Sequence, residues 1–157
     1  MLEFRSILAP TDFSEHASKA LRYAAALAER FGATLHLLHV LPEVVPMAPD
    51  LVAGAPDLVI ATALPPEYYR DTEAESLEAL GRVLDPSWGA VASVERAVRL
   101  GDPVEEIIDY AAEQRIDLIV IATHGRTGLG HVLLGSVAEQ IVRHSPCPVL
   151  TIRDRTT

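Results

Sequence analysis

Residues 117–136 read DLIVIATHGRTGLGHVLLGS, and this stretch decides the fold. Its first part, residues 118–122, is a continuous apolar run with the length and β-branched content of a buried parallel strand. A loop with three glycines between residues 125 and 130 follows, and a helical pattern covers residues 137–144. A strand that leads through a glycine-rich loop into a helix is typical of anion sites, because backbone N–H groups and the helix N-terminus favour phosphate. We therefore expect a phosphate-bearing ligand at this loop.

The length and composition indicate one ordinary globular domain over residues 1–157. A chain of 157 residues can bury a normal core, and 49% hydrophobic with 22% charged residues is usual for soluble proteins. No apolar run approaches the ~18 residues that span a bilayer, and the opening MLEFRS does not predict a signal peptide. The single cysteine, Cys147, cannot form an internal disulfide, so we expect a cytoplasmic protein.

The net charge argues against nucleic acid and anionic membranes as non-specific partners. With 22 acidic and 13 basic residues the formal charge is −9, and such a surface repels polyanions. An anionic ligand must then be held by local backbone donors. Lys19 is the only lysine of the chain, and it lies far in sequence from the glycine-rich loop.

Strand and helix patterns alternate strictly along the chain. The expected strands cover residues 5–9, 34–40, 91–100, 118–122 and 149–153, and the expected helices cover residues 15–31, 66–84, 103–114 and 137–144. Ser14 or Asp12 can cap the first helix, and residues 102–105, DPVE, form a capping box with proline at the first helical position. This order predicts an α/β fold with a doubly wound, five-stranded parallel sheet, Rossmann-like, with helices on both faces.

In a doubly wound sheet, ligands bind outside the carboxyl ends of the strands. Here those ends carry Pro10-Thr11-Asp12, Val40-Leu41 and residues 123–130. We expect these three separated segments to converge on one crevice.

Residues 41–65 form the one long irregular segment. With Pro66 at its boundary it holds six of the eleven prolines, yet it stays rather apolar. Loops of this length are uncommon in compact domains. Two interpretations remain open, a variable connector that rests on the body or a lid over the crevice.

The glycine-rich loop does not match the two commonest phosphate-binding motifs. Gly125 and Gly130 have the spacing of a P-loop, but His131 occupies the lysine position. Gly128 and Gly130 begin a dinucleotide-binding pattern, but Leu133 replaces its third glycine.

Several separated blocks resemble the universal stress protein family, and together they cover nearly the whole chain. They read ILAPTDFS at 7–14, LLHV at 37–40, THGRTGL at 123–129, LLGSVAE at 133–139 and PCPVL at 146–150. The resemblance implies the Rossmann-like fold of adenine-nucleotide α-hydrolases and a single stress-protein domain with a variable loop at 41–65. The nucleotide-binding branch of the family carries G-2x-G-9x-G-[ST] and binds ATP, with Mg²⁺ or Mn²⁺ on the phosphates as a further expectation.

The resemblance also implies which residues contact the nucleotide. Asp12 would meet the adenosine portion, and Val40 would line the adenine pocket. The phosphates would be held by Gly125, Arg126, Gly135 and Ser136. The full expected site comprises Pro10, Thr11, Asp12, Val40, Ala122, His124, Gly125, Arg126, Gly128, Gly135, Ser136 and Val137.

Ala122 departs from the family motif, whose first glycine would stand at this position. If that glycine only passes close to the ribose, a methyl group is tolerable. If the position requires a positive φ, alanine costs about 1 kcal/mol and the pocket shifts.

Some of these residues have simpler structural interpretations. Asp12 and Glu15 have capping-box spacing, Val40 is a core valine, and Ser136 can be the N-cap of the last helix. His124 is more typical of a loop histidine with a backbone partner than of a catalyst. Histidines 36 and 39 have no cysteine or carboxylate at ligand spacing, so no protein-built metal site is expected. No catalytic residue is expected either, since Ser136 lacks the G-x-S-x-G context of a hydrolase nucleophile.

Three functions remain in competition. The first is an ATP-binding stress sensor or regulator, and the second is a slow ATPase or self-phosphorylating protein. The third is a dimeric interaction module of the same fold without a nucleotide. Family resemblance implies a two-fold dimer through the last strand, Val149 to Arg153, which would be an apolar sheet edge if unpaired.

Overall fold

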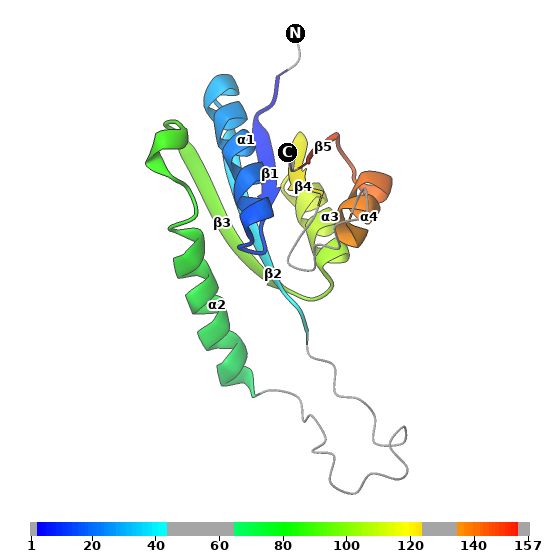
Figure 1. Cartoon of the computed structure of the whole chain (residues 1–157). Helices are drawn as coiled ribbons and strands as arrows, with labels where there is room; N and C mark the ends of the chain where they lie inside the picture. Colours follow the sequence, from blue (N-terminus) through cyan, green and yellow to red (C-terminus); the bar gives the residue numbers. More distant parts are fainter. Residues whose placement is uncertain (1–2, 44–64, 124–134, 154–157) are drawn as a thin grey trace, which may run out of the picture.

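A five-stranded parallel sheet with helices on both faces organises the chain (Figure 1). The computed structural model describes residues 3–43, 65–123 and 135–153. The elements are β1 (Ser6–Pro10), α1 (Glu15–Phe31), β2 (Thr34–Leu41), α2 (Pro66–Leu80), a short 3₁₀ helix (Pro86–Trp88), β3 (Ser93–Leu100), α3 (Pro103–Glu113), β4 (Leu118–Ala122), α4 (Ser136–His144) and β5 (Val149–Ile152). Among the described helices none is long and apolar enough to cross a membrane.

The strand order is β3-β2-β1-β4-β5, and all four neighbouring pairs are parallel. From β1 the chain first winds outward through β2 to β3, then returns to β4 on the other side of β1. The direction of winding therefore reverses between β1 and β4. This topology confirms the predicted doubly wound α/β fold. In folds of this kind ligands bind beside the carboxyl ends of the strands at which the winding reverses, here β1 and β4.

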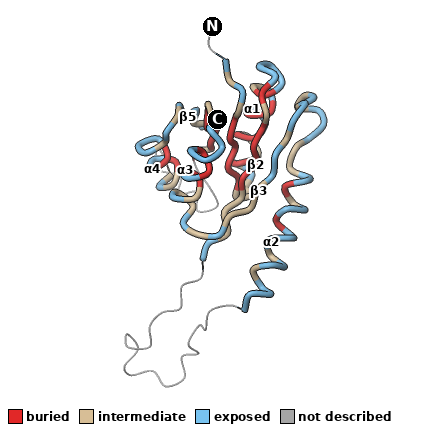
Figure 2. The backbone as a smooth tube through the Cα atoms, turned by 180° about the vertical axis from the view of Figure 1, so that it is seen from behind, coloured by how far each residue is buried: buried red, intermediate tan, exposed pale blue. Residues whose placement is uncertain are grey.

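Two apolar layers hold the helices to the sheet. One layer joins α1 and Leu80 of α2 to one face, and the other joins α3 and α4 to the opposite face. Successive residues of β1 alternate between them, with Ile7 in the first layer and Leu8 in the second. Both side chains are fully buried, and Figure 2 shows the buried segments along the central strands. A strand covered on both faces must be apolar throughout, which explains its continuous hydrophobic run.

The helix ends follow the predicted capping chemistry. Ser14 Oγ accepts the Ala17 N–H at 3.1 Å, which identifies Ser14 rather than Asp12 as the N-cap of α1. Gly32, at φ 64°, ends α1 in the left-handed conformation. Asp102 Oδ1 accepts the N–H groups of Val104 and Glu105 at 2.8 and 3.1 Å and caps α3.

Several predicted boundaries shift by a few residues. Helix α2 ends at Leu80 rather than at residue 84, because Gly81 forms its C-cap and Leu84 then packs against the first apolar layer. Strand β3 begins at Ser93 rather than at residue 91, and β1 lies at 6–10 rather than 5–9. Strand β2 reaches Leu41, α3 ends at residue 113, α4 begins at residue 136, and β5 ends at Ile152, each one residue from the prediction.

Candidate ligand-binding pocket

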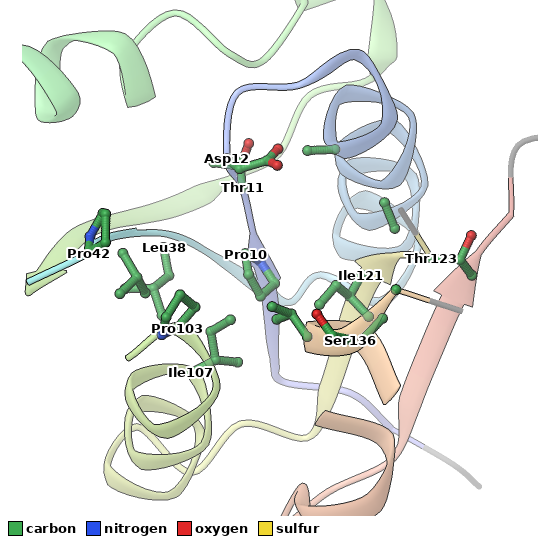
Figure 3. Close-up of a pocket in the computed structure, with 16 residues that line it drawn as sticks. Pro10, Thr11, Asp12, Leu38, Pro42, Pro103, Ile107, Ile121, Thr123 and Ser136 are labelled. Carbon is green, nitrogen blue, oxygen red and sulfur yellow. The ribbon is translucent and has the colours of Figure 1, made fainter. Parts of the chain in front are cut away.

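A pocket of about 480 Å³ opens at the carboxyl ends of the central strands (Figure 3). Its lining comes from the ends of β1, β2 and β4 with the residues that follow them, and from the N-terminal halves of α1, α3 and α4. The lining residues are Pro10, Thr11, Asp12, Ala17, Leu38, Val40, Pro42, Pro103, Ile107, Ile121, Ala122, Thr123, Gly135, Ser136, Val137 and Ala138. The ends of β1, β2 and β4 thus meet at one crevice, at the side of the sheet where the winding reverses.

The pocket has an apolar side and a polar side. Leu38, Val40 and Ile107 provide aliphatic surface from β2 and α3, and Pro42 and Pro103 extend it. Aliphatic surface of this kind suits a flat, weakly polar ring. The polar atoms come from the turn after β1 and from the start of α4, so a bound molecule can be apolar at one end and anionic at the other.

Local hydrogen bonds determine the shape of the turn after β1. The Thr11 N–H donates to the Leu38 carbonyl at 2.8 Å, which extends the β1–β2 ladder by one residue. Thr11 Oγ1 accepts the Phe13 N–H at 3.1 Å, and Asp12 Oδ1 accepts the Ser14 N–H at 3.0 Å. The predicted alternative in which Asp12 serves only as the helix cap is wrong, since Ser14 has that role and Asp12 stands before it at the pocket.

The first turn of α4 brings backbone donors to the pocket. Gly135 is the N-cap, and its N–H donates to the Thr123 carbonyl at the end of β4. The predicted alternative in which Ser136 is the N-cap is therefore wrong, because Ser136 is the first helical residue. A glycine has no side chain to accept the first N–H groups of the helix, in contrast to Ser14 at α1 and Asp102 at α3. Such an end attracts an anion through its N–H groups and the helix dipole.

Ala122 lines the pocket without backbone strain. Of the described non-glycine residues, Phe13 and Arg115 are those with a positive φ, so Ala122 is not in the left-handed region. The energetic cost considered for alanine at this position therefore does not arise.

Part of the predicted site lies outside the described residues. This concerns His124, Gly125, Arg126 and Gly128, and also residues 44–64 of the long loop. The other eight predicted residues, Pro10, Thr11, Asp12, Val40, Ala122, Gly135, Ser136 and Val137, all line the pocket.

The pocket residues of α3 and Leu38 of β2 were not predicted from the sequence. Pro103 and Ile107 line the pocket because α3 begins at the carboxyl end of β3, on the same side of the sheet as the other strand ends. Leu38 shares a face with Val40, two residues away, and strand periodicity could have indicated it. Ile107 could have been found only with the strand order known.

Metal ligands do not cluster in the described part of the chain. Among residues 3–43, 65–123 and 135–153, no three histidine, cysteine or acidic side chains form a group that could hold an ion. A cation at this pocket would need other ligands, such as the phosphates of a bound molecule.

Solved structures share this fold over nearly the whole chain. The universal stress protein UspA from Lactobacillus plantarum has a TM-score of 0.76 and 28% identity, with 98% of this chain and 100% of that chain covered. Protein MJ0577 of Methanocaldococcus jannaschii has a TM-score of 0.76 and 27% identity, with 99% and 100% covered.

Three further structures of the fold carry adenine nucleotides. They are a universal stress protein with cAMP (TM-score 0.63, 23% identity), one from Archaeoglobus fulgidus with dAMP (0.57, 21%) and a family protein from Arabidopsis thaliana with AMP (0.56, 19%). They cover between 96% and 97% of this chain, and between 93% and 99% of their own. At these sequence identities the comparison shows a shared fold only.

Sequence comparison agrees with the fold. Universal stress protein MJ0531 of Methanocaldococcus jannaschii is 31% identical over 150 residues, which cover 96% of this chain and 82% of that protein. The model of the universal stress protein family matches residues 3–153. The chain belongs to the universal stress protein family.

Proposed function

We propose that this protein binds an adenine nucleotide, with ATP as the first candidate, and acts as a nucleotide-dependent sensor or regulator in a stress response. The observation that carries the proposal is the composition of the pocket. Aliphatic surface and a helix N-terminus without a side-chain cap line the same cavity of about 480 Å³. A purine with a phosphate tail has the matching distribution of apolar and anionic parts.

The residues have distinct roles in this proposal. Val40 contacts the adenine from β2, and Asp12 accepts hydrogen bonds from the adenosine portion. The N–H groups at the start of α4 and the Ser136 hydroxyl hold phosphate oxygens. Gly125 and Arg126 complete the phosphate contacts as the family motif implies, and Mg²⁺ or Mn²⁺ accompanies the phosphates.

The nucleotide complexes of the fold neighbours support an adenine nucleotide as the ligand class. Those proteins carry cAMP, dAMP or AMP. A binding experiment on this chain must therefore compare nucleotides that differ in their number of phosphates. A regulatory role is favoured over an ATPase role because no described pocket residue other than Asp12 is a candidate general base. Phosphate release that is proportional to the amount of enzyme and is lost in Asp12→Ala would instead support a slow ATPase.

Calorimetric titration of the protein with ATP, ADP and AMP tests the proposal. We expect saturable heat with wild type and none with Gly135→Val, because a branched side chain at the mouth of α4 displaces phosphate, while the φ of −66° at Gly135 is a backbone conformation that valine adopts without strain. Arg143→Ala, on the exposed part of α4, is the control and should bind as wild type does. Absence of heat and of a thermal shift at millimolar nucleotide would contradict the proposal.

We also propose a homodimer through β5, because this strand forms an apolar edge of the sheet. Its residues Val149–Ile152 pair only with β4 among the described strands, and Leu150 is exposed. Val142, on the neighbouring helix α4, is exposed as well. Unpaired apolar edges associate readily with a second strand. A cytoplasmic location remains a prediction, which fractionation of the native host would test.

A further inference from the structure

Phe13 has an unusual backbone conformation beside the pocket. Its φ is 62°, in the left-handed region that bulky residues rarely adopt. The other described non-glycine residue with a positive φ is Arg115, which ends α3 where such a conformation is routine: the Ile116 N–H reaches back to the Ala111 carbonyl at 2.9 Å. Phe13 ends no helix. Strained residues of this kind persist where their surroundings hold them, and they concentrate at functional sites.

Two groups hold Phe13 in place. Its N–H donates to Thr11 Oγ1 at 3.1 Å, and its ring packs on the imidazole of His39 with ring centroids 4.5 Å apart. The Nδ1 atom of His39 lies 2.8 Å from the Thr11 carbonyl oxygen. Since a carbonyl only accepts, Nδ1 carries the proton and donates it. His39 therefore contacts both the residue before Asp12 and the residue after it.

His39 acts on the turn from outside the pocket. It stands in β2 between Leu38 and Val40, both of which line the pocket, whereas His39 does not. Side chains alternate along a strand, so His39 lies on the α1 face of the sheet. Strand β2 thus holds Thr11 twice, through the bond from Thr11 N–H to the Leu38 carbonyl and through the bond from His39 to the Thr11 carbonyl.

We propose that His39 and Phe13 are positioning residues that fix the Asp12 carboxylate at the pocket and so raise the affinity for a nucleotide that neither of them touches. The inference rests on the proposed function. The hydrogen bond and the ring contact restrict the backbone on both sides of Asp12, so the carboxylate is oriented before the ligand arrives. Preorganisation of this kind lowers the entropic cost of binding.

Three variants separate positioning from a general structural role. His39→Leu removes the Nδ1 donor and replaces the imidazole with an apolar side chain of similar length. His39→Asn keeps an N–H donor near the place of Nδ1. His144→Leu is the matched control, because His144 also bonds a backbone carbonyl through Nδ1, that of Gln140 at 3.0 Å, at the exposed far end of α4.

Calorimetry with ATP gives the first readout. We expect His39→Leu to bind about tenfold more weakly than wild type, the effect of one lost neutral hydrogen bond. His39→Asn should recover most of that loss, and His144→Leu should bind as wild type does. Recovery by asparagine supports a specific donor, because a general packing role would favour the larger, apolar leucine over asparagine.

Amide hydrogen exchange without ligand gives a second, independent readout. We expect the amides of Phe13 and Ser14 to exchange about tenfold faster in His39→Leu, with the amides of β4 unchanged. Wild-type exchange rates at both amides in this variant would overturn the inference.

The two proposals can fail separately. A wild-type protein that binds no adenine nucleotide overturns the proposed function and this inference together. A wild-type protein that binds, with His39→Leu unchanged in affinity or with His39→Asn equally impaired, overturns the inference alone.

Discussion

The two edge strands of the sheet, β3 and β5, differ in length and in charge. Strand β3 has eight residues and carries Glu95, Arg96 and Arg99 among its side chains. Strand β5 has four residues, VLTI, and no charge. Charged side chains on an edge strand oppose pairing with another chain, and an apolar edge invites it. The comparison indicates that one edge is protected and the other is available for a partner.

The two arginines of β3 contact neighbouring helices. Arg99 forms ion pairs with Glu106 and Glu113 of α3, and its guanidinium lies 5.3 Å from the centre of the Tyr110 ring. The hydrogen bond from Arg99 lowers the pKa of the Glu113 carboxyl. Arg96 Nε donates to the Leu80 carbonyl at the end of α2. The protected edge is therefore also a point of attachment for two helices.

The largest expected effect comes from blocking the open edge with Thr151→Pro. The carbonyls of Pro148 and Ile152 point toward β4, so alternation along the strand directs the N–H of Thr151 outward. Proline removes that donor and leaves the β4–β5 ladder intact, so the proposed dimer should weaken about a hundredfold. Light scattering across a concentration series measures the change.

Proline at the other edge supplies the control for this experiment. Ser93→Pro, at the first and exposed residue of β3, should leave the oligomeric state unchanged. A wild-type protein that is monomeric at all concentrations, or a Thr151→Pro variant as dimeric as wild type, would show that β5 is not the interface.

An intermediate effect is expected from removing one of the charges of the β3 edge. Arg99→Leu leaves Glu106, whose side chain is 24% exposed, without its cation and removes the contact with the Tyr110 ring. We expect a loss of about 1–3 kcal/mol in the free energy of unfolding, measured by urea titration.

Arg82→Leu is the matched control for Arg99→Leu. It breaks an exposed ion pair with Glu78, with side chains 71% and 69% exposed, and should cost less than about 0.5 kcal/mol. Equal losses in the two variants would mean that Arg99 contributes no more than an ordinary surface charge.

The smallest effect concerns pH, and it belongs to the β3 side of the sheet. His36 is buried beside β3, with Nδ1 3.1 Å from the Tyr110 hydroxyl. Burial lowers the pKa of His36, and the charge of Glu95 partly opposes that shift. The unfolded chain, with a histidine pKa of about 6.5, then binds more protons than the folded protein, so stability falls as the pH drops below that value.

His36→Asn keeps an acceptor for the Tyr110 hydroxyl and removes the titration. We expect the unfolding free energy of this variant to depend less on pH than that of wild type between about 5 and 7. The difference between the two slopes should be below about 1.4 kcal/mol per pH unit. Urea titrations at several pH values measure the slope. An unchanged slope would assign the pH dependence to other groups, and His144→Asn, at an exposed histidine, is the control.

Much of the fold follows from local sequence signals. The alternation of strand and helix patterns and the capping residues Ser14 and Asp102 each predict the element that the structure contains. The end of α2 was missed because Leu84 continues the apolar pattern, although Gly81 ends the helix and Leu84 packs on the core from a turn. Periodicity cannot separate these two ways of burying a leucine.

The pocket was less predictable from the sequence than the fold. The rule for doubly wound sheets led to the ends of β1, β2 and β4. Ile107 was missed because α3 packs on β2, and this contact depends on the strand order. The left-handed conformation of Phe13 could not be predicted from the sequence, because phenylalanine rarely adopts a positive φ. It is held by His39, which is 26 positions away along the chain.

One carboxylate at the opposite end of the sheet bears on the pocket as well. Asp117 Oδ2 accepts the N–H groups of Arg5 and Ser6 at 2.7 and 3.0 Å, just before β1 enters a short ladder with β4. A slip of one residue there would carry Asp12 about 3.3 Å along the strand and turn the side chains of β1 to the wrong faces. Two consecutive amides on one oxygen admit a single alignment. Asp117 therefore fixes the register of β1 against β4. The position of Asp12 at the pocket thus depends in part on hydrogen bonds at the opposite end of β1.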